Sequence, residues 1–600
     1  MDASLFVFTS VADRIWTSVI FDSVDVRLPA NATQPTRALV RGIFLRSISL
    51  DGIRRLIGLG ADVNVLVALT CSCRIQHVGI LSLAIDTSSI FPPLKSASPV
   101  WRWRTREVQA AILNELILAG ASVNGGNDHT IVPIKMAKES LNMTAVEVLL
   151  SHHVAVRGHP SLASSPLLFI DRLGQPLAGY FSAEKQDVLF NISARLLQHD
   201  PSLATDMDID GKTTVMSVCR VAFISISQIW IDQYLAMLVE RGASLTQRQQ
   251  GGGGGEATPL TPLQCAAWAS NHTALTYLLG RIPSTEVNRR FLHVGGVRTA
   301  LYWAASGLKS KLTRYHGKSV GVRLTMWTML PNRVDEAKRC IRTLLRHGGS
   351  IDLLPSHTQE TQHKRSLVLE EYAAILNELP QRVMIAINAA LKRQRDTAVR
   401  VGCLLPMAPH HDGAYPHPSP SSLTFGPQEA ISIAWKIGAF LHDPSAARAV
   451  VDEFLIADSP LKRRVGAAVD HVINQAATKT VSNREVVGKT AMGKGRTGEG
   501  LLQWLKSVVN VTGGEQGGPT MGEPPLQCFA IKGGEDGQHR RLGVREVVHR
   551  ARLDEAAVYG LEGSIIKGFN SHLGNTDCDF RWGQLGYVDK DGHFVSLGIN

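Results

Sequence analysis

The 600-residue chain has only one closely spaced cysteine pair, and it lacks long apolar runs and a basic N-terminal segment. Its eight cysteines are scattered, and the one close pair, Cys71 and Cys73, has no second pair at zinc-binding spacing. A disulfide scaffold and a zinc module are therefore disfavoured, and reduced thiols in the cytoplasm or the nucleus are the simplest account. The longest apolar run, Val221–Ile231, is too short to cross a bilayer, so no membrane insertion is expected. The N-terminus has no basic segment before its apolar run, which argues against a cleaved signal peptide.

Aromatic residues make up only 6% of the chain and charged residues 19%, whereas 44% is hydrophobic. Small apolar side chains must therefore carry most of the packing, which suits closely stacked helices. The net charge of +11 permits attraction to nucleic acid or to acidic partners. Spread over 600 residues it is a mild excess, so a basic soluble protein is favoured over a nucleic-acid binder.

A chain of this length exceeds one compact core, so several domains or a repeat array are expected. One spacing recurs in two separate segments. Leu263 precedes Leu278-Leu279 by 15 and 16 residues, and Ile134 precedes Leu149-Leu150 by the same 15 and 16. Two segments with one spacing indicate repeats more strongly than either motif alone.

Leucine-rich segments also end in the same way at four places, where Gly60, Gly120, Gly242 and Gly348 are each followed by a small residue. Glycine adopts the left-handed conformation that ends a helix without a Cβ clash, and the small residue lets neighbouring repeats approach closely. Thr261-Pro262-Leu263 shows how such a helix begins, because threonine accepts a backbone N–H and proline suits the first turn. The pattern predicts pairs of helices.

These motifs, Thr-Pro-Leu-x-x-Ala-Ala followed by Leu-Leu-x-x-Gly-Ala, resemble the ankyrin repeat. The resemblance implies a mainly α fold, with an ankyrin-type helical solenoid of about seven irregular repeats over residues 36–355. Residues 1–35 are expected to form an N-terminal helical cap, 356–405 a helical cap of helices Ser366–Leu379 and Gln381–Arg400, and 406–427 a Pro-rich linker. Residues 428–600 resemble no family, but are expected to be mostly helical with a terminal β-hairpin turning at Asp591-Gly592.

The repeats depart from the family pattern in places. His153 occupies a usual glycine position, and Leu301 lies 43 residues before Leu344, which implies an insertion between the two helices of that repeat. The stack is therefore expected to be irregular.

Three segments resemble chemical sites, but each has a simpler interpretation. Asp206–Gly211 begins like a calcium loop, yet position twelve is Ser217 where a glutamate is needed, and a turn between repeats is favoured. Gly493–Gly498 matches G-x-G-x-x-G, but only a short apolar segment precedes it, so a flexible basic linker is favoured over a phosphate site. His410, His411 and His417 lie in the Pro-rich linker, without a framework to hold a metal.

Trp101–Arg106 interleaves tryptophan with arginine, as surfaces for single-stranded nucleic acid do. Tryptophan packing onto the array with arginine in solvent is the favoured alternative. Neither H-E-x-x-H nor G-x-S-x-G occurs. The sequence therefore predicts no catalytic residues, no cofactor and no metal.

The resemblance to ankyrin proteins implies a non-enzymatic scaffold or adaptor that holds an unidentified protein partner on its concave face and its turns. Carried over position by position, the candidate partner-binding residues follow the Ala-Ala pair of each first helix or lie in a turn. They are Trp268, Ala269, Ser306, Gly307, Glu139 and Ser140, with Asp208, Ile209 and Lys212 in the turn. Two alternatives remain open: an adaptor with a nucleotide-binding or catalytic region in 428–600, and a basic nucleic-acid-binding protein. The oligomeric state and the partner's identity are not predicted.

Overall fold

The structure is a computed structural model, and it divides the chain into two compact units. Unit 1 comprises Met1–Ile341 and Asp352–Lys364, and unit 2 comprises Arg342–Ile351 and Arg365–Asn600. The described residues are those outside 1–7, 10–13, 16–23, 72–73, 87–102, 126–129, 158–182, 209–210, 221–226, 251–258, 294–295, 317–323, 405–432, 479–529, 533–539, 566–572, 574–577, 589–592 and 600.

Unit 1 is built from helix pairs, as the recurring motifs predict. The first helices of the pairs are α1 (Gln34–Phe44), α3 (Ile80–Ala84), α5 (Pro133–Glu139), α9 (Thr214–Arg220), α11 (Pro262–Ala269) and α13 (Ala300–His316). The second helices are α2 (Leu50–Gly58), α4 (Arg106–Leu118), α6 (Met143–Ser151), α8 (Ala183–His199), α10 (Gln228–Glu240), α12 (His272–Leu279) and α14 (Leu324–Arg346), the last of which extends into unit 2.

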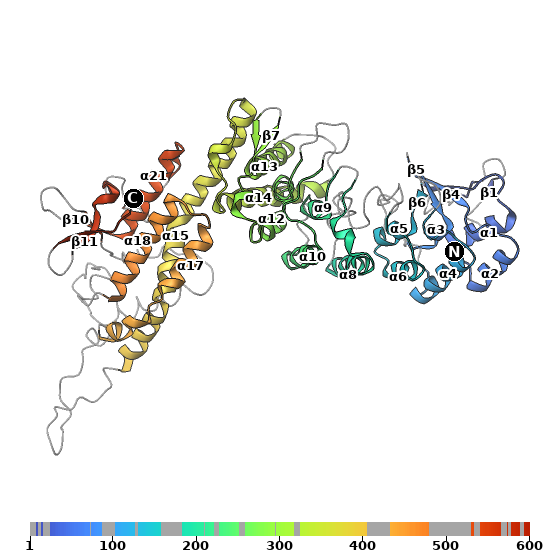
Figure 1. The fold of residues 1–600 in the computed structure, drawn as a ribbon, viewed down its shortest axis with the longest axis horizontal. Helices are drawn as coiled ribbons and strands as arrows, with labels where there is room; N and C mark the ends of the chain where they lie inside the picture. The colour runs from blue at the N-terminus through green and yellow to red at the C-terminus, as the bar shows by residue number, and fades with distance from the viewer. Residues whose placement is uncertain are drawn as a thin grey trace, which may run out of the picture. The chain divides into compact units, whose positions relative to one another are not determined.

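The helices stack in two rows. First helices pack on first helices, in the runs α1–α3–α5 and α9–α11–α13, and second helices pack on second helices from α2 through to α12. Figure 1 shows α1, α3 and α5 along one side of the blue-to-cyan part, with α2, α4 and α6 along the other. This mainly α solenoid confirms the predicted fold class for unit 1.

Four second helices, α2, α4, α10 and α14, are followed by a glycine in the left-handed conformation, which turns the chain. Gly60, Gly120, Gly242 and Gly348 have φ between 84° and 93°, and Ala61, Ala121 and Ala243 then donate backbone hydrogen bonds back into the helices. At Gly60 and Gly120 a Cβ would meet no atom within 4 Å, so the backbone angle and not lack of space favours glycine there.

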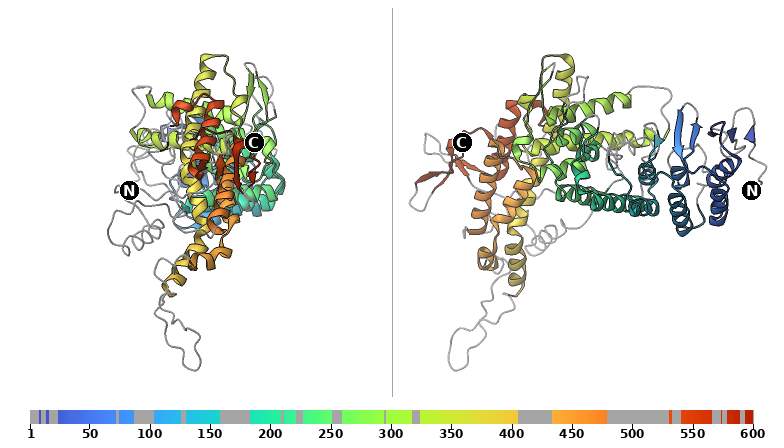
Figure 2. Two further views of the ribbon diagram at one scale, coloured as in Figure 1. Left: turned by 90° about the vertical axis from the view of Figure 1, so that its left-hand side faces the viewer. Right: turned by 45° about the vertical axis from the view of Figure 1, so that its right-hand side comes forward.

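A six-stranded sheet at the start of the array is not predicted by the sequence analysis. Its strands are β1 (Phe8–Thr9), β2 (Arg14–Ile15), β3 (Val24–Arg27), β4 (Leu66–Cys71), β5 (Arg74–Gly79) and β6 (Thr130–Ile131), in that order. In Figure 2, right, the blue strands lie together beside the first helices. The helical cap expected over residues 1–35 is therefore wrong: their described part forms β1–β3 and a turn, and only Gln34 and Pro35 are helical, as the start of α1. The reason is pairing with a distant segment, because Val24 lies opposite Cys71 and Val26 opposite Leu69.

A short hairpin, β7 (Phe291–His293) and β8 (Gly296–Arg298), precedes α13. Together with β5 before α3 and β6 before α5, it places extended segments immediately before three first helices. The N-terminal end of each of these helices is therefore preceded by a hydrogen-bonded strand rather than by an irregular loop.

Unit 2 combines helices with a four-stranded sheet. The helices are α15 (Gln359–Leu404, of which Arg365 onward lies in unit 2), α17 (Pro444–Phe454), α18 (Pro460–Thr478) and α21 (Val544–Val558). The strands are β9 (Ala530–Lys532), β10 (Arg540–Leu542), β11 (Leu585–Val588) and β12 (Phe594–Ser596), in the order β10–β9–β11–β12. The predicted terminal hairpin is confirmed, with Tyr587 opposite Val595, although its turn residues lie outside the described residues.

The helix that was expected to cap the array contributes to the core of unit 2. Leu376, Val383 and Ile387 of α15 are buried in one cluster with residues of α17, α18, α21 and the sheet, and Figure 1 shows α15, α18 and α21 side by side. The helix is also continuous through Pro380, where two helices were predicted. Burial of Leu376 and Val383 on either side of Pro380 offsets the hydrogen bond that proline removes. The predicted Pro-rich linker lies outside the described residues.

Candidate protein-binding surface

Among the described side chains of the first helices, Trp268 is the most exposed large hydrophobic one. Helix α11 begins with a capping box, in which Thr261 Oγ1 accepts from the Gln264 N–H and the Gln264 side chain accepts from the Thr261 N–H. Of its eight residues seven are buried, while 41% of Trp268 is exposed. The indole therefore projects from a helix that is otherwise core, which is the arrangement of a contact residue.

Arg220 lies over the ring of Trp268, and the sequence analysis missed it. Its guanidinium carbon is 5.5 Å from the centroid of the ring, so the last residue of α9 stacks on α11. The signal was in the sequence: Arg220 follows Thr213 by seven residues, as Trp268 follows Thr261. Both threonines accept a backbone N–H at the start of their helices, which sets the same register.

A second cation approaches from the other neighbouring helix. Lys311 of α13 donates to Ser270 Oγ at 2.7 Å and approaches the Ala269 carbonyl oxygen at 3.4 Å. It thus lies at the C-terminal end of α11, where helix carbonyl oxygens attract positive charge. Arg220 and Lys311 therefore lie on either side of the helix that carries Trp268.

Two of the predicted contact residues are packed inside the array instead. Ala269 is 7% exposed, and Gly307 is buried at the crossing of α11 and α13. A Cβ on Gly307 would come within 2.4 Å of the Trp268 carbonyl oxygen, so this glycine permits the close approach of the two helices. Ser306 is half-buried and donates to the Tyr302 carbonyl oxygen. Of these four residues, Trp268 and Ser306 reach the surface, and this corrects the expectation for Ala269 and Gly307.

The predicted contact residues Asp208 and Lys212 stabilise the turn in which they lie. Asp208 Oδ1 accepts from the Lys212 N–H at 2.7 Å, Asp208 donates its N–H to the Lys212 carbonyl oxygen, and Gly211 has φ of 72°. Met207 and Thr213 form an isolated antiparallel bridge across it. This geometry agrees with the predicted turn rather than a calcium loop. Ile209 lies outside the described residues, and Asp208 and Lys212 are half-buried.

Glu139 and Ser140 end the first helix α5. Leu141 follows them with φ of 53°, as Ser270 with φ of 60° follows α11. Glu139 therefore occupies the place in α5 that Trp268 occupies in α11. The structure does not bring it to Trp268, because α11 packs on α9 and α13.

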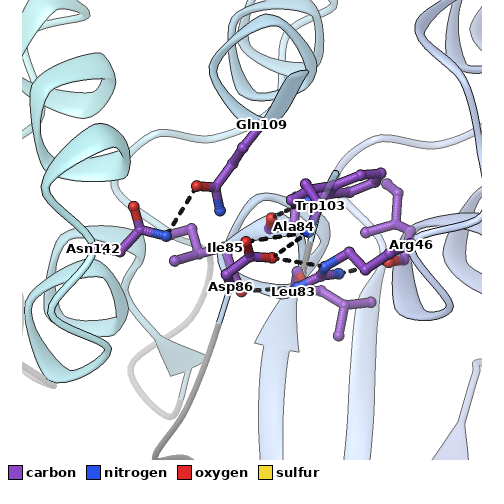
Figure 3. A network of polar contacts seen from close by, with 9 residues as sticks. Arg46, Leu83, Ala84, Ile85, Asp86, Trp103, Gln109 and Asn142 are labelled. Carbon is purple, nitrogen blue, oxygen red and sulfur yellow. Dashed lines mark hydrogen bonds and ion pairs between the residues drawn. The ribbon is translucent and has the colours of Figure 1, made fainter. Parts of the chain in front are cut away.

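A buried polar network joins the first three helix pairs at a different place (Figure 3). Arg46, with φ of 54°, donates from Nε to Asp86 Oδ1 at 3.0 Å and from its terminal nitrogens to the Ile43, Leu83 and Ile85 carbonyl oxygens. Trp103 donates from Nε1 to the Ala84 carbonyl oxygen, and its ring lies 5.0 Å from the Arg46 guanidinium carbon. Burial lowers the pKa of Arg46, and the neighbouring Asp86 carboxylate opposes that shift.

This Arg46 network is structural. The guanidinium binds the C-terminal carbonyl oxygens of α3, and Asp86 in turn accepts from the Trp103 N–H. Trp103 is 6% exposed, which confirms packing on the array for the described tryptophan of the Trp101–Arg106 segment. Gln109 and Asn142 continue the polar contacts, because Asn142 Nδ2 donates to Gln109 Oε1 at 3.0 Å.

The described residues show no chemical centre. No group of three or more His, Cys, Asp or Glu side chains among them could hold a metal ion. Cys219 and Cys265 lie behind the candidate surface, where burial raises the pKa of the Cys219 thiol and the neighbouring Cys265 raises it further. Such a thiol is protonated and unreactive. The glycine-rich segment 493–498 and His410, His411 and His417 lie outside the described residues. Among the described helices, none is both long and apolar enough for a membrane span.

Comparisons with known proteins add little to this geometry. No family model and no curated protein matches the chain. Among solved structures it resembles the crystal structure of the human ASB11 ankyrin repeat domain, at 19% identity over 49% of this chain and 96% of that chain, with a TM-score of 0.27. A likeness at that score carries no weight for the site.

Proposed function

We propose that this chain is a non-enzymatic scaffold or adaptor that binds a protein partner on the surface formed by α9, α11 and α13. The observation that supports it most is the half-exposed Trp268 on a helix whose other residues are buried. Tryptophan and arginine are the side chains that most often dominate binding energy at protein interfaces, and here Arg220 stacks on Trp268. The network around Arg46 has no such role, because its groups are buried and bonded to one another.

Substitution of Trp268 tests this role. We expect Trp268→Ala to remove the partners that the full-length chain recovers by proximity labelling and affinity capture. Because the side chain is 41% exposed, the variant is expected to stay folded and to lose about 1–3 kcal/mol of stability, from the cation–π contact and the buried part of the ring. Both quantities are measured on the same preparations, the partners by quantitative mass spectrometry and the stability by thermal unfolding.

Leu118 supplies the matched control. It is 77% exposed at the end of α4, on the second-helix row, so Leu118→Ala removes a large apolar side chain away from the candidate surface. We expect this variant to keep the partner set. A large fall in melting temperature for Trp268→Ala would show that Trp268 is a core residue. An unchanged partner set in both variants would show that the surface is not used.

A further inference from the structure

The charge of the candidate surface is one-sided. Helices α9, α11 and α13 contain no aspartate or glutamate, whereas α9 ends at Arg220 and α13 carries Lys309 and Lys311. Lys309 pairs with Glu360, which is itself 59% exposed in its side chain. Arg220 makes no ion pair with a carboxylate within the described part of the chain, and its recorded contact is the Trp268 ring. The three helices that form the surface therefore carry basic side chains and no carboxylate.

We propose that the surface formed by Arg220, Trp268 and Lys311 recognises an extended acidic segment of a partner protein. This inference rests on the proposed function and specifies the partner's chemistry. A carboxylate can accept from the guanidinium edge of Arg220 while the guanidinium face stays on the indole, because these two interactions use different parts of the group. The exposed part of Trp268 then covers an apolar side chain between two acidic ones. Lys311, which donates to Ser270 near the C-terminal end of α11, adds a second positive charge from the other neighbouring helix.

A protein segment suits this surface better than nucleic acid does. Single-stranded nucleic acid stacks its bases on open aromatic faces, and the guanidinium of Arg220 covers one face of Trp268 at 5.5 Å. Nucleic acid also requires a track of cations along its phosphates, whereas this surface offers Arg220 and Lys311 on the two helices that flank α11.

The test measures binding of a defined probe to the purified full-length chain. The probe is a fluorescein-labelled twelve-residue peptide of three Glu-Ser-Glu-Leu repeats, followed by fluorescence anisotropy at several salt concentrations. The comparison probes are the same peptide with lysine for glutamate and a twelve-residue thymidine oligonucleotide. We expect the acidic peptide to bind, the lysine peptide not to bind, and the affinity to fall as salt rises.

Two variants assign the binding to this surface. Arg220→Glu is expected to lower the affinity for the acidic peptide by at least tenfold, and Trp268→Ala to lower it by about fivefold. Each substitution removes one of the paired interactions. Arg195→Glu is the control, because Arg195 is exposed on α8 and the substitution changes the net charge by the same amount. It is expected to leave the affinity within twofold. Circular dichroism checks folding, and if Arg220→Glu does not fold, Arg220→Gln is used, with the same direction expected.

The outcomes distinguish an acidic protein segment from nucleic acid and from an effect of net charge alone. Equal losses in Arg220→Glu and Arg195→Glu would overturn the proposal, because net charge alone would then explain binding. Tighter binding of the oligonucleotide, lost in Arg220→Glu, would replace it with nucleic-acid binding. Loss of captured partners in Trp268→Ala, with the acidic peptide unaffected by either variant, would keep the proposed function and remove the acidic specificity. If the captured partners are unchanged in Trp268→Ala but the affinity for the acidic peptide falls in both variants, the proposed function is contradicted instead.

Discussion

Where first and second helices of the array end in the left-handed conformation, they reach it with different residues. After the second helices, Gly60, Gly120 and Gly242 have φ of 84° to 93°. After the first helices, Arg46, Leu141 and Ser270 have φ of 53° to 60°, a conformation that is unfavourable for a residue with a Cβ. The two kinds of end therefore differ in how the backbone conformation is stabilised.

Side-chain contacts offset the strain at the first-helix ends. Arg46 binds three carbonyl oxygens and Asp86, and Ser270 is 4% exposed and accepts from Lys311. At the second-helix ends Gly60 and Gly120 have open space around them, so no side chain there would gain comparable contacts. The first-helix ends thus depend on tertiary contacts, whereas the second-helix ends depend on an intrinsic property of glycine.

Removal of the Arg46 side chain should have the largest effect on this difference. We expect Arg46→Ala to destabilise unit 1 by about 3–5 kcal/mol, because it leaves Asp86 and three carbonyl oxygens in a largely buried site without their donor. Chemical denaturation followed by circular dichroism measures the loss. Arg55→Ala, at an exposed position of α2, is the control and should change stability by less than about 0.5 kcal/mol. Equal values for the two variants would contradict the role of the network.

Gly307 tests the close packing of first helices beside the candidate surface. We expect Gly307→Ala to cost about 1–3 kcal/mol, because its Cβ would lie 2.4 Å from the Trp268 carbonyl oxygen and α11 and α13 would have to separate. Gly58→Ala in α2 is the control, since a Cβ there meets nothing within 4 Å and alanine favours a helix. Denaturant midpoints of the two variants give the comparison. A tolerated Gly307→Ala would show that the two helices can move apart at little cost.

Gly120 tests the second-helix ends. We expect Gly120→Ala to lower local stability by about 1 kcal/mol, although the site is open, because the left-handed conformation itself is costly for alanine. Hydrogen exchange of the amides in α4 measures the effect. Exchange that stays unchanged would show that alanine adopts the left-handed conformation at this site at little cost.

Substitution of His153 is expected to have the smallest effect on stability, and to stabilise rather than destabilise. It is exposed after α6, at the place where α2, α4, α10 and α14 are followed by glycine, and its φ is 57°. We expect His153→Gly to stabilise α6 by about 0.5 kcal/mol, because the strain of the left-handed histidine is removed and part of that gain is lost to backbone entropy. Slower hydrogen exchange in α6 would support this, and faster exchange would show that the imidazole makes a contact of value.

Local signals in the sequence determined much of the array. The threonine caps, the prolines in first turns and the glycines after second helices act through the backbone of their own segment, so the helix pairs and their ends could be predicted. The terminal hairpin could be predicted for the same reason, and the structure pairs Tyr587 with Val595 in it. Trp268 was predicted as a contact residue because it directly follows the Ala266-Ala267 pair of its helix.

Only the tertiary structure decided the features that depend on distant segments. Strand β3 exists because Val24 and Val26 pair with β4, about 45 residues away, and a helical spacing of apolar residues could not reveal that. Arg220 lies on Trp268, and Gly307 lies under the Trp268 carbonyl oxygen, because α9, α11 and α13 stack. Short-range geometry fixes where helices begin and end, but contact between helices decides which side chains at those positions stay exposed for a partner.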